Sequence, residues 1–235
     1  IIELGESKMV TIRKEMIGAI PLLHVVEEKK LNSKLPLVIF IHGFESIKER
    51  NVQYAYMLAD KGYRVVLPDA LYHGERAEGE ISSVNFWKVT LITLHELSLI
   101  KDEFVKRGLV EDNRIGVAGT SMGAIVTLGA MTQYNWIRTG VSLMGTPSYV
   151  EFAKYQLHLM EQQGAKLSYT KEQIEEQLAL LRPYDVTERI DQFESRPLMF
   201  WHGAKDPVVP YQQAYGFYEQ LQDKYKKENV PLTFI

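Results

Sequence analysis

The five residues Gly119 to Gly123, in the order Gly-Thr-Ser-Met-Gly, combine a nucleophile with the glycines that a sharp turn needs. Residues 113–118 read as a buried strand before this motif, and residues 124–131 read as a buried helix after it. A serine at such a turn holds its hydroxyl out over the sheet edge, and the glycines let the backbone bend without a Cβ clash. The Met122 N–H and the positive end of the helix face any negative charge that forms on an attacked carbonyl. Ser121 is therefore a candidate nucleophile.

The flanking elements matter to this interpretation, because a Gly-x-Ser-x-Gly pattern arises by chance in roughly one chain in ten of this length. Most chance matches lack a strand directly before the motif and a helix directly after it, so this context favours a functional motif.

A second loop of chemical interest, His42-Gly43-Phe44, follows residues 37–41. That run is continuously apolar, as a strand covered on both faces must be. Since an open α/β sheet places its ligands at the carboxyl ends of its strands, we expect this loop beside Ser121. The Phe44 N–H is then a second oxyanion donor, with Gly43 allowing close backbone approach. We expect His42 to hold the loop by hydrogen bonding rather than to act as a base.

An aspartate follows the strand predicted at residues 197–201. Asp206 lies in a loop made rigid by glycine and proline, where it is placed to orient and charge-stabilise a histidine that activates Ser121. The alternative is that Asp206 only caps the helix that begins near Tyr211. His202, at the end of the same strand, is expected to be buried and to brace the loop.

The elements that position these residues alternate between apolar strands and amphipathic helices. They predict an α/β protein with a mostly parallel central sheet flanked by helices, in a single domain of residues 1–235. An antiparallel hairpin within residues 8–28 is expected at the sheet edge. A long helix at residues 83–107 has an apolar stripe of Phe86, Val89, Thr90, Thr93, Leu94, Leu97, Ile100 and Phe104.

The alternation breaks at residues 148–182, where two helical patterns are separated by Gly164. Two helices inserted between strands suggest a small helical cap over the strand ends, where it forms the apolar wall of a substrate pocket. The alternative is a helical pair that packs on the core and contacts no substrate.

Several polar residues favour structural roles. His24 is expected on the surface of an edge strand, His95 in the core and His158 on the exposed face of the cap. The loop at residues 69–76 is a candidate rim of the site. For Asp69 and Arg76 an ion pair or loop brace is favoured over a direct substrate contact.

The composition bounds the class of protein. The chain has 235 residues, 46% of them hydrophobic, a net charge of -3 and no cysteine. The weak acidic balance argues against nucleic acid or an anionic membrane as the main partner. The absence of cysteine excludes disulfides, thiolate catalysis and cysteine metal sites, and it fits a cytoplasmic location. No apolar run reaches the roughly 20 residues of a membrane span, and the start of the chain shows no signal peptide.

Four motifs in this order resemble the α/β-hydrolase superfamily, and more narrowly its small bacterial esterase-like members related to dienelactone hydrolases and to the catalytic domain of prolyl oligopeptidase-type enzymes. They lie at residues 37–44, 69–76, 119–123 and 202–210, so the resemblance covers essentially the whole chain. It implies an α/β-hydrolase fold with Ser121 as nucleophile, Asp206 as acid, and the Phe44 and Met122 N–H groups as the oxyanion hole. A dienelactone hydrolase proper would carry cysteine as nucleophile, so that activity is not favoured.

The catalytic histidine of such a triad has no counterpart in the sequence. The family order is Ser, Asp, His, but all six histidines (His24, His42, His73, His95, His158 and His202) precede Asp206. Without a base, a serine hydroxyl is a poor nucleophile. Three explanations stay open: the catalytic histidine follows Ile235 in the natural chain, which we favour because a bare final strand is unusual; His73 substitutes from another loop; or the protein is a non-catalytic relative.

These observations predict a carboxylesterase-like serine hydrolase that cleaves a small-molecule ester through an acyl-enzyme on Ser121. A serine peptidase or a thioesterase acting on short acyl or peptide substrates shares every motif, and a non-catalytic hydrolase-fold binding protein is the third alternative. This chemistry needs no metal and no organic cofactor. The physiological substrate, its acyl-chain length and the oligomeric state, a homo-oligomer included, stay open.

Overall fold

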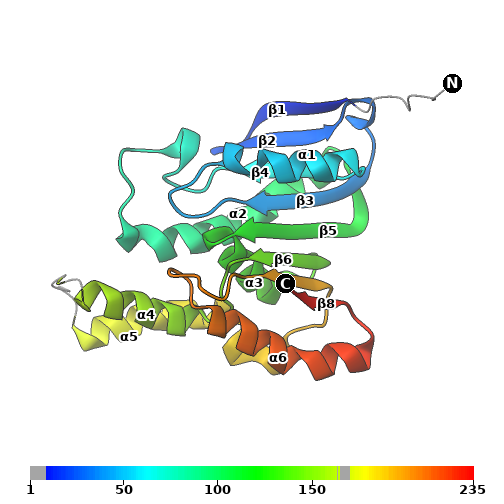
Figure 1. Ribbon diagram of the computed structural model, residues 1–235. Helices are drawn as coiled ribbons and strands as arrows, with labels where there is room; N and C mark the ends of the chain where they lie inside the picture. Colours follow the sequence, from blue (N-terminus) through cyan, green and yellow to red (C-terminus); the bar gives the residue numbers. More distant parts are fainter. Residues whose placement is uncertain (1–8, 163, 165–169) are drawn as a thin grey trace.

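A computed structural model describes residues 9–162, 164 and 170–235. In this part of the chain eight strands form one sheet, in the order β1-β2-β4-β3-β5-β6-β7-β8 (Figure 1). β2 pairs antiparallel with β1 and with β4, and the other neighbouring pairs are parallel. The strands are β1 (Val10–Ile17), β2 (Ile20–Glu27), β3 (Leu35–Ile41), β4 (Arg64–Pro68), β5 (Val110–Thr120), β6 (Thr139–Leu143), β7 (Leu198–Trp201) and β8 (Leu232–Phe234). The predicted mostly parallel sheet and its antiparallel edge hairpin are both confirmed.

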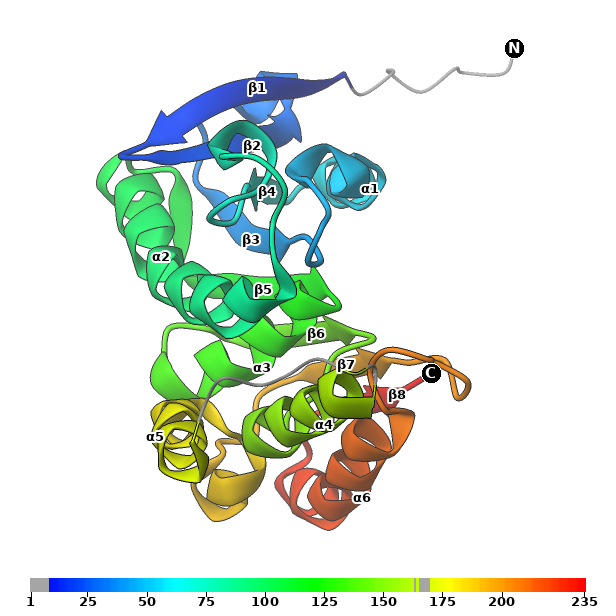
Figure 2. The same cartoon turned by 90° about the vertical axis from the view of Figure 1, so that its left-hand side faces the viewer.

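Helices cover both faces of this sheet. Figure 2 shows α1 and α6 on one side of the strands and α2 and α3 on the other. The helices are α1 (Val52–Asp60), α2 (Phe86–Lys106), α3 (Met122–Gln133), α4 (Tyr149–Gln162), α5 (Lys171–Leu181) and α6 (Tyr211–Glu228). Figure 1 shows α4 and α5 beyond the edge at which the parallel strands end. α4 and α5 therefore lie near the loops that leave the carboxyl ends of the parallel strands (Figure 1).

The core forms where helical stripes meet fully covered strands. All eight residues of the stripe predicted on α2 are buried. β3 lies in the middle of the sheet, and its Leu37, Ile39 and Ile41 have no exposed surface. α3 is buried on nearly every side from Met122 to Met131, because the sheet, α2 and α4 all pack around it. An apolar helix of this kind is expected only inside a protein.

The sequence prediction was wrong for two histidines. His24 is 2% exposed, because β1 covers the outer edge of its strand and the ring of Phe104 packs edge-on at 5.1 Å. His95 is exposed rather than part of the core, and its Nε2 lies 3.0 Å from the Tyr184 hydroxyl. It lies next to the buried stripe of α2 but just outside it, so helical spacing alone misplaced it.

His24 belongs to a buried polar network that joins β1, β2 and β4. Its Nδ1 is 2.7 Å from Glu15 Oε1, and its Nε2 contacts the guanidinium of Arg64. Arg64 has no exposed surface and donates to three carbonyls of the β2–β3 connection, those of Lys30, Leu31 and Ser33. A neutral His24 is required here, because a protonated Nε2 would point a second donor at the arginine.

Burial lowers the pKa of His24 below its ordinary value, which predicts a pH-dependent stability. In the unfolded chain a histidine binds a proton near pH 6.5, whereas folded His24 binds one only at a lower pH. The contribution of neutral His24 to the free energy of unfolding is therefore complete above that pH and decreases as the pH falls. We expect the free energy of unfolding to fall between pH 7.5 and pH 5 by up to about 1.4 kcal/mol per pH unit for this one proton.

Urea unfolding of the wild type, His24→Gln and His158→Gln across this pH range checks the prediction. His158 is exposed on α4, so its variant should keep the wild-type dependence. His24→Gln should show a shallower dependence, and a slope equal to that of the wild type would contradict the role given to His24.

Candidate active site

The carboxyl ends of four neighbouring strands lie in one row. Ile41 of β3 is paired with Gly119 of β5, and Leu143 of β6 is paired with Thr120 on one side and Trp201 of β7 on the other. The loops that follow these positions therefore leave the sheet at one edge. The structure brings together there the segments that carry Phe44, Ser121 with Met122, and Asp206, as the sequence predicts.

Ser121 has a backbone conformation that L-residues rarely adopt, with φ 54° and ψ -114°. Such a conformation costs about 1–3 kcal/mol and persists only where the surroundings hold it. Here the Ser121 N–H donates to the Leu143 carbonyl at 2.8 Å. The Ser121 carbonyl accepts from the N–H groups of Ala124 at 2.9 Å and Ile125 at 3.0 Å. The turn therefore holds the serine in a strained position between β5 and α3.

The two glycines of the motif are required by space. A Cβ on Gly119 would lie 2.3 Å from the Gly123 carbonyl carbon, and one on Gly123 would lie 2.2 Å from the Ile41 carbonyl oxygen. Neither distance is compatible with a side chain. A Cβ on Gly43 would lie 3.4 Å from Ser121 Cβ, so the loop after β3 passes close to Ser121.

The backbone N–H groups of Met122 and Phe44 are the candidate oxyanion donors. Met122 is the first residue of α3, and the first N–H groups of a helix have no intrahelical acceptor. Phe44 lies in the loop that passes close to Ser121. Within residues 9–162, 164 and 170–235, neither the Phe44 nor the Met122 N–H donates a hydrogen bond. The N-terminus of α3 at Met122 favours negative charge there, and both N–H groups are available as donors.

Asp206 is held as a hydrogen-bond acceptor at the same edge. Its Oδ1 accepts from the N–H groups of Val208 and Val209, both at 2.9 Å, and its side chain is 14% exposed. Its Oδ2 lies 3.5 Å from Nε2 of His202. The residue that caps α6 is Pro210, without a side-chain hydrogen bond. The alternative role for Asp206 as the cap of that helix is therefore wrong.

The histidines nearest this edge form hydrogen bonds within the fold: both ring nitrogens of His42 and of His73 are engaged, whereas Nδ1 of His202 has no partner among the described residues. His42 bonds the Gly43 carbonyl through Nδ1 and the Ala70 N–H through Nε2. His73 bonds the Leu71 carbonyl and the Glu45 N–H in the same way. His202 is buried, and its Nε2 lies 3.0 Å from the Val209 carbonyl. The bracing roles predicted for His42 and His202 are confirmed, and His73 has no free nitrogen to serve as a base.

The sequence prediction found the brace at Asp69 and Arg76 but missed its main partner, Lys48. The Asp69 carboxylate has no exposed surface and accepts from Lys48 Nζ at 2.5 Å. Arg76 instead forms two hydrogen bonds with Glu96 and donates to the Asp69 backbone carbonyl. Burial opposes the charge on Lys48, but hydrogen bonds to acidic side chains, Asp69 first, raise its pKa above the ordinary value. No local signal marks Lys48, because 21 residues separate the pair.

An aromatic wall connects the Phe44 loop to the inserted helices. Phe44 packs against Phe86 with ring centroids 5.3 Å apart, and Phe86 packs against Phe152 of α4 at 6.0 Å. Trp87 contacts both Phe86 and Phe152 and donates to the Gln156 side chain. This wall is apolar and lies next to the Met122 end of α3.

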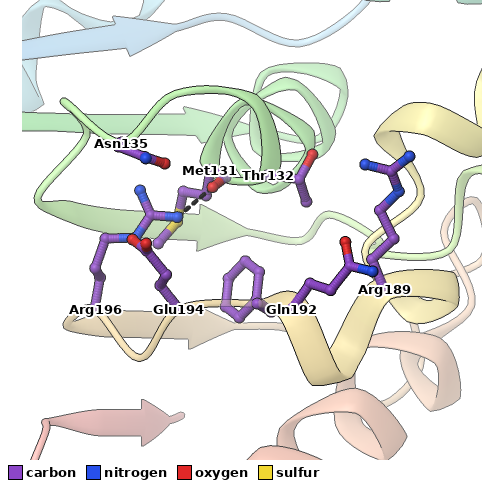
Figure 3. A pocket seen from close by; sticks show the side chains of 8 residues that line it. Met131, Thr132, Asn135, Arg189, Gln192, Glu194 and Arg196 are labelled. Atoms are coloured by element: carbon purple, nitrogen blue, oxygen red, sulfur yellow. Dashed lines mark hydrogen bonds and ion pairs between the residues drawn. The ribbon is translucent and has the colours of Figure 1, made fainter.

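A separate cavity of about 90 Å³ lies away from this edge, at the C-terminal end of α3 (Figure 3). Arg196 contributes to it and donates to the carbonyls of Tyr134 and Ile137, and also of Met131. Because these carbonyls lie at the end of α3 and just after it, the arginine serves to close that helix.

Neither a metal centre nor a membrane span is found in the part of the chain that the structure describes. Its His, Asp and Glu side chains form no group of three or more arranged to hold a metal ion. None of its helices is both long enough and apolar enough to cross a bilayer.

The strand order, the strained serine at the strand-to-helix turn and the two free N–H groups beside it define the class of α/β-hydrolase-fold serine hydrolases. The chain belongs to the prolyl oligopeptidase family, whose model matches residues 50–234. It is 44% identical over 230 residues to "Putative esterase YitV" of Bacillus subtilis, covering 97% of this chain and 90% of that protein. It is 29% identical over 217 residues to "Esterase YjfP" of Escherichia coli, covering 92% and 86%.

Solved structures show the same fold. TT1662 from Thermus thermophilus superposes with a TM-score of 0.71 at 19% identity, covering 97% of this chain and 89% of that one. The acylaminoacyl peptidase of Pyrococcus horikoshii gives a TM-score of 0.66 at 19% identity, covering 98% of this chain and 37% of that longer one. The predicted fold and the predicted resemblance are confirmed.

Proposed function

We propose that this serine hydrolase is a carboxylesterase that forms an acyl-enzyme on Ser121. The observation that carries the proposal is the strained backbone of Ser121, at the N-terminus of α3 and close to the loop that carries Phe44. The N–H groups of Phe44 and Met122 have no acceptor among the described residues. Strain of this kind at a reactive side chain is characteristic of functional sites. The esterase names of the two relatives reported above support an ester as substrate.

The reaction proceeds in two halves. The Ser121 hydroxyl attacks the ester carbonyl as a base takes its proton, and the Phe44 and Met122 N–H groups bind the oxyanion that forms. The oxyanion collapses, the base returns its proton to the departing alcohol, and the acyl group remains on Ser121. Water, activated by the same base, then releases the carboxylic acid and restores the serine.

The base in this proposal is a histidine that follows Ile235, oriented by Asp206. β8 runs parallel to β7, and the Ile235 carbonyl accepts from the His202 N–H at 3.1 Å. A chain that continues from β8 therefore emerges at the edge where Asp206 lies. With Oδ1 engaged by two loop amides, Oδ2 is the Asp206 oxygen that would accept a histidine N–H.

We further propose that residues 148–182 act as a cap within one domain of residues 1–235. Phe152 of α4 continues the aromatic wall that begins at Phe44, so an acyl or alcohol group bound to Ser121 would contact an apolar surface. The expected substrate is a small apolar ester. The absence of cysteine fits a cytoplasmic location for this enzyme.

Two measurements on the full-length natural protein test the function. A fluorophosphonate, which labels only activated serines, should add a single group that peptide mass mapping places on Ser121. Short-chain p-nitrophenyl esters should be hydrolysed faster than the corresponding peptidyl p-nitroanilides. A folded protein that takes up no label would contradict the catalytic role of Ser121.

A serine peptidase is the second candidate, because the family match and the P. horikoshii peptidase fold share the same framework. Faster cleavage of the anilides than of the esters would favour it. The esterase is preferred because both sequence relatives carry that name and match this chain along most of their length.

A further inference from the structure

Two loops at the sheet edge that carries Ser121 are joined by a reciprocal pair of hydrogen bonds. The oxyanion loop, residues 42–48, follows β3, and the neighbouring loop, residues 69–76, follows β4. The Ala70 N–H donates to Nε2 of His42 at 3.0 Å, and the Glu45 N–H donates to Nε2 of His73 at 3.0 Å. Each histidine therefore accepts a backbone N–H from the opposite loop.

These contacts set the tautomer of both rings. A neutral imidazole whose Nε2 accepts must carry its proton on Nδ1. His42 donates this proton to the Gly43 carbonyl at 2.7 Å, and His73 donates it to the Leu71 carbonyl at 2.8 Å. Burial lowers the pKa of both histidines, that of His42 to about 4. Both rings therefore remain neutral, and keep their acceptor nitrogen, around pH 7.

The Gly43 carbonyl belongs to the same planar peptide group as the Phe44 N–H. In a trans peptide these two groups point in opposite directions, so fixing one fixes the other. The Gly43 oxygen accepts from His42 Nδ1 and also from the Ser46 N–H at 3.2 Å. Rotation of this peptide would break both bonds. The Phe44 N–H is thereby held in one direction.

His73 holds the other side of Phe44. Its ring lies edge-on to that of Phe44, with centroids 5.2 Å apart, and it binds the N–H of the next residue, Glu45. Glu45 has a left-handed backbone with φ 61°, which few non-glycine residues adopt without support. Beyond it, Asp69 accepts from both the N–H and the Nζ of Lys48. The oxyanion loop is thus attached to its neighbour before and after Phe44.

We propose that His42 and His73 are positioning residues that hold the Phe44 N–H ready to bind the oxyanion. The inference rests on the proposed function, since it requires that this N–H binds the developing negative charge. Both histidines act through the backbone and touch no reacting atom. A hydrogen-bond donor that is already oriented before the reaction stabilises the transition state more than it stabilises the bound ester.

Substitution of His73 tests the proposal in the full-length protein. His73→Phe keeps an aromatic ring against Phe44 but loses the acceptor for the Glu45 N–H, whereas His73→Gln keeps an acceptor near the position of Nε2. We expect His73→Phe to lower kcat about 10- to 100-fold, the range expected for a misplaced oxyanion donor, with KM within about twofold. His73→Gln should retain most of the wild-type kcat.

A transition-state analogue separates this role from a general loss of structure. The affinity of His73→Phe for a trifluoromethyl ketone should fall by the same factor as kcat, with the circular dichroism spectrum unchanged. If His73→Phe does not fold, His73→Asn replaces it, because the shorter amide keeps the Leu71 contact but does not reach the Glu45 N–H.

The outcomes distinguish this inference from the function on which it rests. A wild type that hydrolyses esters, with His73→Phe or His73→Asn matching its kcat, would overturn the positioning role alone. A rise in KM with kcat unchanged would overturn it as well. A wild type without ester hydrolysis and without fluorophosphonate labelling would overturn the proposed function and this inference together.

Discussion

Replacing Ser121 by alanine is expected to abolish ester hydrolysis without weakening the fold. Loss of the nucleophile in a serine hydrolase of this type lowers kcat by roughly 10⁵- to 10⁶-fold, which leaves only the effect of substrate binding and the oxyanion donors. Alanine keeps the Cβ, so the strain at φ 54° is unchanged and the unfolding temperature should match that of the wild type. Hydrolysis of p-nitrophenyl esters and fluorophosphonate labelling measure the loss of activity, and thermal unfolding measures the stability separately.

A glycine at this position gives the complementary result. Glycine adopts a positive φ without strain, so Ser121→Gly should be equally inactive but more stable than Ser121→Ala by about 1–2 kcal/mol. Ser83 is exposed and distant in sequence, and Ser83→Ala serves as the control that should change neither property. Retention of hydrolysis in either Ser121 variant would contradict the acyl-enzyme mechanism.

Gly123→Ala is expected to damage both the stability and the activity of the protein. Its Cβ would lie 2.2 Å from the Ile41 carbonyl oxygen, so either α3 or β3 must move. We expect the free energy of unfolding to fall by about 3 kcal/mol. A displacement of about 1 Å between Ser121 and the Phe44 loop should lower kcat about 100-fold.

Gly216 provides a matched control for this substitution. It lies within α6, and a Cβ built there has nothing within 4 Å. Gly216→Ala should therefore raise stability by about 0.5–1 kcal/mol, as alanine does in an open helical position, and leave kcat unchanged. Urea unfolding and ester hydrolysis of both variants check the pair. A Gly123→Ala protein as stable and active as the wild type would show that the elbow tolerates a side chain.

The sequence by itself determined the features that depend on local pattern. The turn around Ser121 was predictable because five consecutive residues and their flanking apolar runs specify strand, turn and helix. The buried stripe of α2 followed from helical spacing, and all of its eight residues are in the core. The position of Asp206 in a loop after β7 was predictable because glycine and proline mark that loop.

Only the tertiary structure decided the features that depend on distant parts of the chain. His24 is buried because β1 and Phe104 cover it, and neither is adjacent to it in sequence. The partner of Asp69 is Lys48, which lies 21 positions earlier in the chain. The orientation of the peptide group between Gly43 and Phe44 also depends on a distant residue. His42 Nδ1 bonds the Gly43 carbonyl, and the Ala70 N–H donates to Nε2 of the same ring. Local pattern specifies which elements form, whereas burial and hydrogen-bond partners depend on which elements the fold brings into contact.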